Sequence, residues 1–73
     1  MKLIQGCCYT VPGASLNIYV RKIKYTSLLY TDACIEFVRK GKNWSVFETI
    51  KNARLVHSQI SHWERVKHEN SSN

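Results

Sequence analysis

Alternating apolar and polar residues over positions 16–49 are the clearest structural signal in this 73-residue chain. Even-numbered positions are apolar over Leu16–Val20, which is typical of a strand with one buried face. The apolar positions then change parity, to Ile23 and Tyr25. Because such a change moves side chains to the opposite face of a strand, it predicts a β-bulge near Arg21-Lys22.

Turn residues divide the chain into segments with strand character. Pro12-Gly13 predicts a type II turn, because Pro fixes φ at the first central position and Gly supplies the positive φ at the second. Thr26-Ser27 is a weaker turn signal, and the polar segment 39–43 contains Gly and separates two apolar runs, as a hairpin loop does. The predicted strands are 3–11, 16–25, 28–39, 44–50 and 64–67, with a short helical turn over Ile60–Trp63 before the last of them.

The C-terminal segment from position 45 also fits a helix. Ser45-Val46-Phe47-Glu48 matches a capping box, and apolar residues follow at spacings of three and four over 46–66. This spacing predicts a helix of about 20 residues packed on a three-stranded sheet. Against it, β-branched residues such as Thr49 and Ile50 lower helix propensity, and the hairpin loop requires a strand after it.

We therefore expect a mainly β fold: a small antiparallel curled sheet or barrel of four to five strands, with a short helical turn near the C-terminus. This arrangement resembles the SH3-like small barrels in outline. The alternative is an α+β fold, with a three-stranded sheet and one C-terminal helix. We expect residues 1–67 to form a single small β domain and the polar residues 68–73 to fray.

The cysteines and the N-terminus point to the cytoplasm. Three cysteines, Cys7, Cys8 and Cys34, are an odd number and argue against a disulfide framework. The six residues before Cys7 contain no apolar segment of the length a signal peptide needs. No apolar run approaches the roughly 20 residues needed to span a bilayer. We expect reduced thiols and no membrane association.

A net charge of +6 favours polyanionic partners. Two basic clusters, 21–24 and 39–42, hold six of the eleven Lys and Arg residues, and on a hairpin they lie about 23 Å apart at ~3.3 Å per residue. Exposed aromatic rings beside cations are typical of proteins that bind single strands. The candidate nucleic-acid-binding residues are Arg21, Lys22, Lys24, Arg39, Lys40, Lys42, Tyr19 and Trp44.

The same basic residues also fit an ordinary solvated surface. Asp32 is predicted to lie across from Ile23, and Glu36 across from Tyr19. The two carboxylates are then diagonal neighbours of Arg21 or Lys24, and cross-strand pairing with them neutralises part of the charge.

Catalysis, metal binding and cofactor binding have no support in the sequence. Structural zinc sites use Cys and His pairs at set spacings, and here His57 and His62 have no suitably spaced Cys pair to complete a site. The carboxylates form no pair, and the isolated glycines build no phosphate loop. A chain this short also has little room for a pocket of several hundred Å³. We expect no enzyme activity, no cofactor, no metal and no small-molecule substrate.

Two functions remain level on the sequence alone. The first is a small basic module that binds nucleic acid through a basic strand and a hairpin tip. The alternative is a protein-interaction module, or a homo-oligomer in which a second copy completes a marginal core, with no role in nucleic-acid binding.

Overall fold

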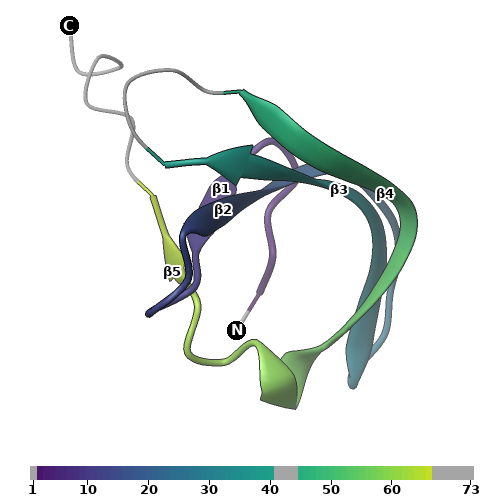
Figure 1. Cartoon of the computed structure of the whole chain (residues 1–73). Helices are drawn as coiled ribbons and strands as arrows, with labels where there is room; N and C mark the ends of the chain where they lie inside the picture. Colours follow the sequence, from purple (N-terminus) through teal and green to yellow (C-terminus); the bar gives the residue numbers. More distant parts are fainter. Residues whose placement is uncertain (1, 41–44, 67–73) are drawn as a thin grey trace, which may run out of the picture.

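The protein forms one antiparallel sheet in a computed structural model that describes residues 2–40 and 45–66 (Figure 1). Its strands are β1 (Cys8–Thr10), β2 (Leu16–Thr26), β3 (Tyr30–Arg39), β4 (Val46–Val56) and β5 (Glu64–Arg65), with a 3₁₀ turn, η1 (His57–Gln59), before β5. The order across the sheet is β4-β3-β2-β1-β5, and every pair is antiparallel. The predicted mainly β fold is confirmed. The tail predicted at 68–73 lies outside the described residues.

The alternative prediction, a C-terminal helix from position 45 onward, is wrong, since β4 occupies Val46–Val56. β4 pairs along its length with β3, for example through Ala33↔Ala53 and Ile35↔Ile50. The register shifts between these two pairs, so β4 has one extra residue there. A bulge of this kind lengthens the spacing between inward-facing residues from two to three, which imitates helical periodicity.

Bulges also shape β2. Its register with β3 shifts between Val20 and Lys22, where the sequence predicts a bulge, and again between Ile23 and Tyr25. Bulges bend a strand and increase its twist. With bulges in both β2 and β4, the sheet bends, and β3 and β4 curve strongly around the core (Figure 1).

The concave face of this curved sheet holds the core. β2 and β3 supply its centre, where Val20 and Ile35 pair across the two strands and are buried. Ile60, which follows η1, is also buried in this core. The buried cluster consists of Leu3, Tyr9, Ile18, Val20, Ala33, Ile35 and Ile60.

The sheet does not close into a full barrel. β4 and β5 are its two edges, and in the described part of the chain no ladder joins them. Side chains on the inner face of β4, such as Ile50 and Leu55, are therefore only partly buried. The concave face is left accessible from one side.

The predicted Pro12-Gly13 turn is confirmed. The N–H of Ala14 donates to the carbonyl of Val11 at 3.0 Å, and Gly13 has φ +85°, as a type II turn requires. The turn joins β1 to β2 and places Val11 and Ala14 near each other at one end of the sheet.

Replacing Gly13 by Ala should destabilise the protein by about 1–2 kcal/mol in urea unfolding, because an L side chain disfavours positive φ. An added Cβ meets no atom within 4 Å, so the cost is conformational rather than steric. Gly13→Asn is the matched control, since Asn tolerates this conformation better, and it should lose less. Equal losses in the two variants would contradict the argument.

Among the described residues, no helix is long and apolar enough to cross a bilayer.

Candidate functional site

The convex side of β2, β3 and β4 carries polar and aromatic residues. Alternate residues of β3, namely Asp32, Cys34 and Glu36, face away from the buried Ala33 and Ile35. Residues paired directly across strands share a face, so their partners define the same surface. We call it the outer face, and it includes Tyr19, Lys22, Tyr25, Asp32, Cys34, Glu36 and Arg54.

Two bulges bring Lys24 and Asn52 onto this surface on either side of β3. The second register shift of β2 leaves Lys24 without a partner in the ladder, and the shift in β4 does the same for Asn52. The Nζ of Lys24 donates to Oδ1 of Asn52, so the lysine side chain spans β3. These two residues line a pocket of about 310 Å³ together with Tyr25, Asp32, Ala53 and Arg54.

The aromatic and charged side chains at this pocket contact one another. Arg54 donates to both carboxylate oxygens of Asp32, at 2.9 and 3.0 Å. Its guanidinium also stacks over the ring of Tyr30, 4.0 Å from the ring centroid. The centroids of the Tyr30 and Tyr25 rings are 6.1 Å apart. Hydrogen bonding to Arg54 lowers the pKa of Asp32, which keeps the pair ionised. Tyr25 is 56% exposed, which leaves it available for stacking.

The outer face keeps an excess of positive charge after its ion pairs are counted. Within residues 2–40 and 45–66 the ion pairs are Arg54–Asp32 and Arg21–Glu36, the latter at 3.3 Å. Lys22 and Lys24 are exposed and have no carboxylate partner in that part of the chain. The surface therefore presents two unneutralised ammonium groups close to an exposed aromatic ring.

The predicted cross-strand neighbours are partly right. Glu36 lies across from Tyr19 and pairs with Arg21, as expected. The prediction for Asp32 is wrong, because Asp32 lies across from Tyr25 instead of Ile23. Each of the two bulges in β2, between Val20 and Lys22 and at Lys24, inserts one residue, and together they shift this register by two positions.

The second basic cluster lies at the other end of the hairpin. Arg39 is opposite Leu16, whereas Thr26 and Thr31 form the last pair at the turn end. The guanidinium of Arg39 lies 5.0 Å from the centroid of the Phe47 ring. Lys40 Nζ donates to the carbonyl of Ala14 at 2.6 Å.

The structure thus brings together some of the predicted site residues and separates others. Arg21, Lys22 and Lys24 lie near one another on β2, and the half-buried Tyr19 precedes them on the same strand. Arg39 and Lys40 belong to a different region, while Lys42 and Trp44 lie outside the described residues. The clusters do not form one continuous patch in the described chain.

Arg54, Tyr30 and Asn52 are members of the outer face that sequence reasoning missed. The predicted fourth strand ends at Ile50, which leaves no reason to place Arg54 beside the first basic cluster. A strand continuing to Val56 carries Arg54 to the position opposite Asp32. The available signal was the opposite charge of Asp32, on one predicted strand, and of Arg54, four residues beyond the end of the next one.

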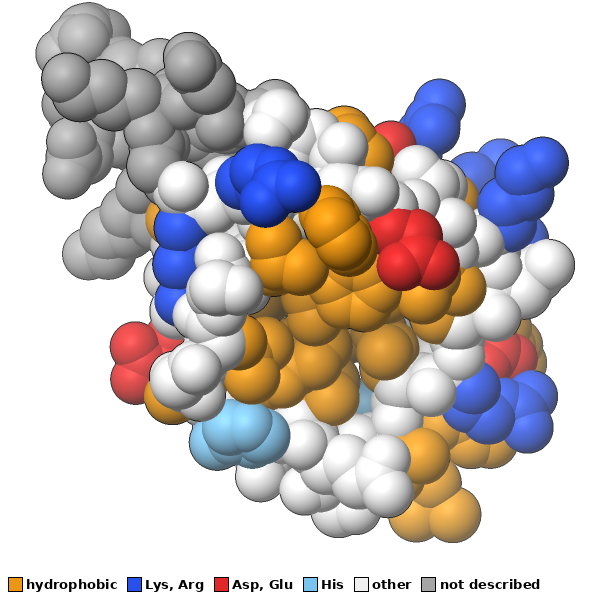
Figure 2. Space-filling model, in the orientation of Figure 1, with side chains coloured by type: hydrophobic (Ala, Val, Ile, Leu, Met, Phe, Trp, Pro, Cys, Tyr) orange, Lys and Arg blue, Asp and Glu red, His pale blue; other side chains and the backbone are white. Residues whose placement is uncertain are grey.

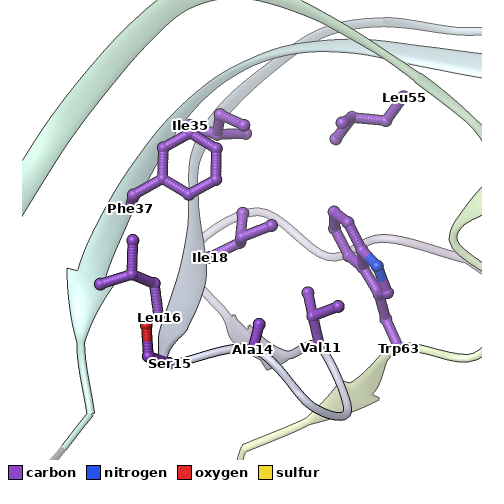
Figure 3. Close-up of a pocket in the computed structure, with 9 residues that line it drawn as sticks. All are labelled: Val11, Ala14, Ser15, Leu16, Ile18, Ile35, Phe37, Leu55 and Trp63. Atoms are coloured by element: carbon purple, nitrogen blue, oxygen red, sulfur yellow. The ribbon is translucent and has the colours of Figure 1, made fainter.

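The concave side of the sheet holds an apolar pocket of about 430 Å³. Side chains from β2, β3, β4 and the segment before β5 point into it, among them Ile18, Phe37, Leu55 and Trp63 (Figure 3). The space-filling view shows the same hollow as a concentration of hydrophobic side chains surrounded by polar and charged ones (Figure 2). The expectation that a chain this short has little room for such a pocket is wrong, because the sheet stays open between its edges.

The thiols show no arrangement for metal binding in the described residues, where no group of three or more His, Cys, Asp or Glu side chains converges. Cys8 is fully buried, and burial raises the pKa of its thiol from 9.0 to about 11. A thiol with so high a pKa is a poor nucleophile at neutral pH.

Comparison of the chain with protein-family models, with curated proteins and with solved structures finds no match.

Proposed function

We propose that this protein is a small nucleic-acid-binding module without catalytic activity, and that the outer face is its binding surface. The carrying observation is the pair Lys22 and Lys24, which are exposed and, within residues 2–40 and 45–66, have no carboxylate partner, beside the exposed Tyr25. Cations contact phosphates, and an aromatic ring gives a base something to stack on.

The geometry favours a single strand as the ligand. Base stacking on a side chain requires an unpaired base, and each stacked base contributes about 1–3 kcal/mol. Tyr25 lines the same pocket as Lys24, Asn52 and Arg54, whose polar groups can donate hydrogen bonds to base edges or phosphates. Asp32, which also lies on this surface, accepts two hydrogen bonds from Arg54 and therefore repels phosphate less than an unpaired carboxylate does.

We further propose that the fold is an open variant of the SH3-like small barrels. In support, a long three-stranded meander is followed by a 3₁₀ turn, and the last strand returns to pair with the first. This arrangement leaves the outer face of β2, β3 and β4 uncovered by other described elements.

Replacing Lys22 and Lys24 together by Gln tests the proposed interface. The variant is titrated with a labelled single-stranded oligonucleotide. We expect the slope of log K against log salt to become less negative by about 1.4, or ~0.7 for each lost phosphate contact. Fluorescence anisotropy at several salt concentrations measures this slope.

The pair Arg39→Gln and Lys40→Gln is the matched control. It removes the same charge from the other end of the hairpin and should change the slope less. If Lys22→Gln/Lys24→Gln binds as tightly as the parent at every salt concentration, the proposed interface is wrong. A separate variant, Tyr25→Leu, distinguishes the contribution of stacking from that of charge. It should weaken single-strand binding without altering the slope of log K against log salt.

A protein-interaction role is the second candidate, and the turn between β2 and β3 favours it. Leu28 and Leu29 in this turn are 92% and 70% exposed, and exposed apolar side chains that lie together are typical of interfaces. Pairing through the edge of β4 is less favourable, because its two irregularities, near Phe47 and near Asn52, interrupt the regular ladder that an added strand needs. A melting temperature that rises with protein concentration would support self-association.

A further inference from the structure

We propose that the apolar pocket binds a small amphipathic anion: a short alkyl chain or ring carrying one carboxylate. This site lies on the concave side of the sheet and is separate from the outer face. It also gives a role to Arg39 and Lys40, which lie away from the proposed nucleic-acid interface. The inference therefore does not depend on the proposed function.

The pocket has the size and lining of a ligand site. Its volume of about 430 Å³ falls within the range of ~300–1,000 Å³ that is usual for small-molecule pockets. Among its nine lining residues, Ser15 and Trp63 alone have polar side-chain atoms. An apolar body of the ligand fits this lining, since there is little to hydrogen-bond with a polar one.

The pocket is more than an incompletely filled core. Ile18 and Ile35 on its floor are buried, yet Phe37, Leu55 and Trp63 in its walls are only partly buried. These walls stay accessible because no strand joins β4 to β5 in the described chain. Covering them with an apolar ligand removes apolar surface from water, which is favourable.

Two cations lie next to the pocket's lining residues. Arg39 pairs across the ladder with Leu16, and Lys40 Nζ is anchored to the carbonyl of Ala14. Leu16 and Ala14 both line the pocket (Figure 3). Glu48, which pairs with the lining residue Phe37, is the acidic neighbour on this side. The two cations exceed it in charge, so the rim favours a ligand whose head group is a single anion.

The stacking of Arg39 on Phe47 also supports an anionic head group at the rim beside Arg39 and Lys40. The guanidinium is held over the Phe47 ring at 5.0 Å, and Lys40 is tied to the turn that follows β1. Two partly ordered donors lose less conformational freedom on binding a carboxylate than two free side chains do. Each of these donors can form a charge-assisted hydrogen bond with a carboxylate at this rim.

Titration with hexanoate, octanoate and decanoate tests the proposal, with Trp63 fluorescence as the readout. A Trp44→Phe background leaves Trp63 as the single Trp of the chain. We expect saturable binding that tightens about fourfold for each added methylene, until the chain outgrows the pocket. Absence of saturable binding at millimolar octanoate would overturn the proposal.

Head-group recognition is tested by comparing octanoate with octanol and octylamine. We expect octanoate to bind most tightly, and Arg39→Gln/Lys40→Gln to weaken octanoate at least fivefold while leaving octanol unchanged. Lys22→Gln/Lys24→Gln removes the same charge from the outer face and should leave octanoate binding unchanged. Equal binding of the three ligands, or equal loss in the two double variants, would contradict recognition of an anion.

The location of the site is tested by filling the pocket. Ala14 is exposed and lines the pocket, so Ala14→Phe should block octanoate and octanol alike without disturbing the core. Ser15→Phe is a second blocking variant in case the first fails to fold, as judged by thermal melting. Folded blocking variants that still bind octanoate would place binding elsewhere and overturn the assignment. Binding of apolar peptides, but not of octanoate, would show instead that the pocket receives a protein side chain.

Discussion

Replacing Tyr9 by Ala is expected to leave the protein largely unfolded at 25 °C. Tyr9 is 2% exposed and belongs to the buried cluster on the concave face of the sheet. Its hydroxyl accepts a hydrogen bond from the N–H of Ile4 at 2.9 Å, which ties the N-terminal segment to the core. One residue therefore fills the core and also holds the chain that precedes β1.

The size of this effect follows from the size of the protein. Truncating a large buried aromatic side chain to Ala costs about 3–5 kcal/mol. A domain of this length is stabilised by roughly 0.05–0.15 kcal/mol per residue, so the loss is comparable with the whole stability. Far-UV circular dichroism and urea unfolding measure the outcome.

Tyr9→Phe is the matched control, since it keeps the ring and removes the hydroxyl. We expect it to fold and to lose about 1 kcal/mol, the usual net contribution of one hydrogen bond. A Tyr9→Ala variant as stable as Tyr9→Phe would show that the ring is not packed in the core.

Stability should also fall as the pH rises above about 9, and the thiol of Cys8 is the reason. Burial raises the pKa of Cys8 from 9.0 to about 11 in the folded protein, so the unfolded chain loses this proton first. The contribution of the buried neutral thiol is therefore complete below pH 9 and is lost progressively as the pH approaches 11. At about 1.4 kcal/mol per pKa unit, the loss amounts to roughly 2–3 kcal/mol.

Urea unfolding between pH 8 and about 11 measures this dependence, with Cys8→Ala as the control. The control removes the titrating group, so its unfolding free energy should fall less steeply over the same range. An equally steep fall in the control would assign the effect to other groups that titrate at alkaline pH.

Local features of the sequence predict much of this fold correctly. The parity change after Val20 predicts a bulge where β2 indeed has one, and Pro12-Gly13 predicts the observed turn. Both are short-range effects, in which neighbouring residues determine the backbone conformation.

The features that sequence reasoning missed depend on contacts between strands. The bulge in β4 changes the spacing between Ile50 and Ala53 to three residues, which makes a strand look like a helix. The bulge at Lys24, together with the one before Lys22, places Tyr25 instead of Ile23 opposite Asp32, and the β3–β4 register places Arg54 on its other side. Neither bulge is marked by Gly or Pro, so the sequence around them contains no local signal.

In the candidate site, too, the features set by neighbouring residues were predictable and those set by contacts between strands were not. The first basic cluster lies together on β2 because its members are adjacent in the chain, as predicted. Its association with Arg54 and Tyr30 requires the register of three strands, and the apolar pocket requires that the sheet stay open. These are properties of the whole sheet, which no single segment reveals.

The pairing of β5 with β1 has a consequence for the order in which the protein folds and opens. β1 to β4 form successive hairpins, whereas Tyr9 pairs with Arg65 across most of the length of the chain. Closing so long a loop costs more entropy than closing a hairpin, so β5 is expected to dock last. A two-residue strand that docks last is also the first to detach in local opening. Because Trp63 lies immediately before β5 and lines the apolar pocket, each such opening would also displace one wall of that pocket and widen it.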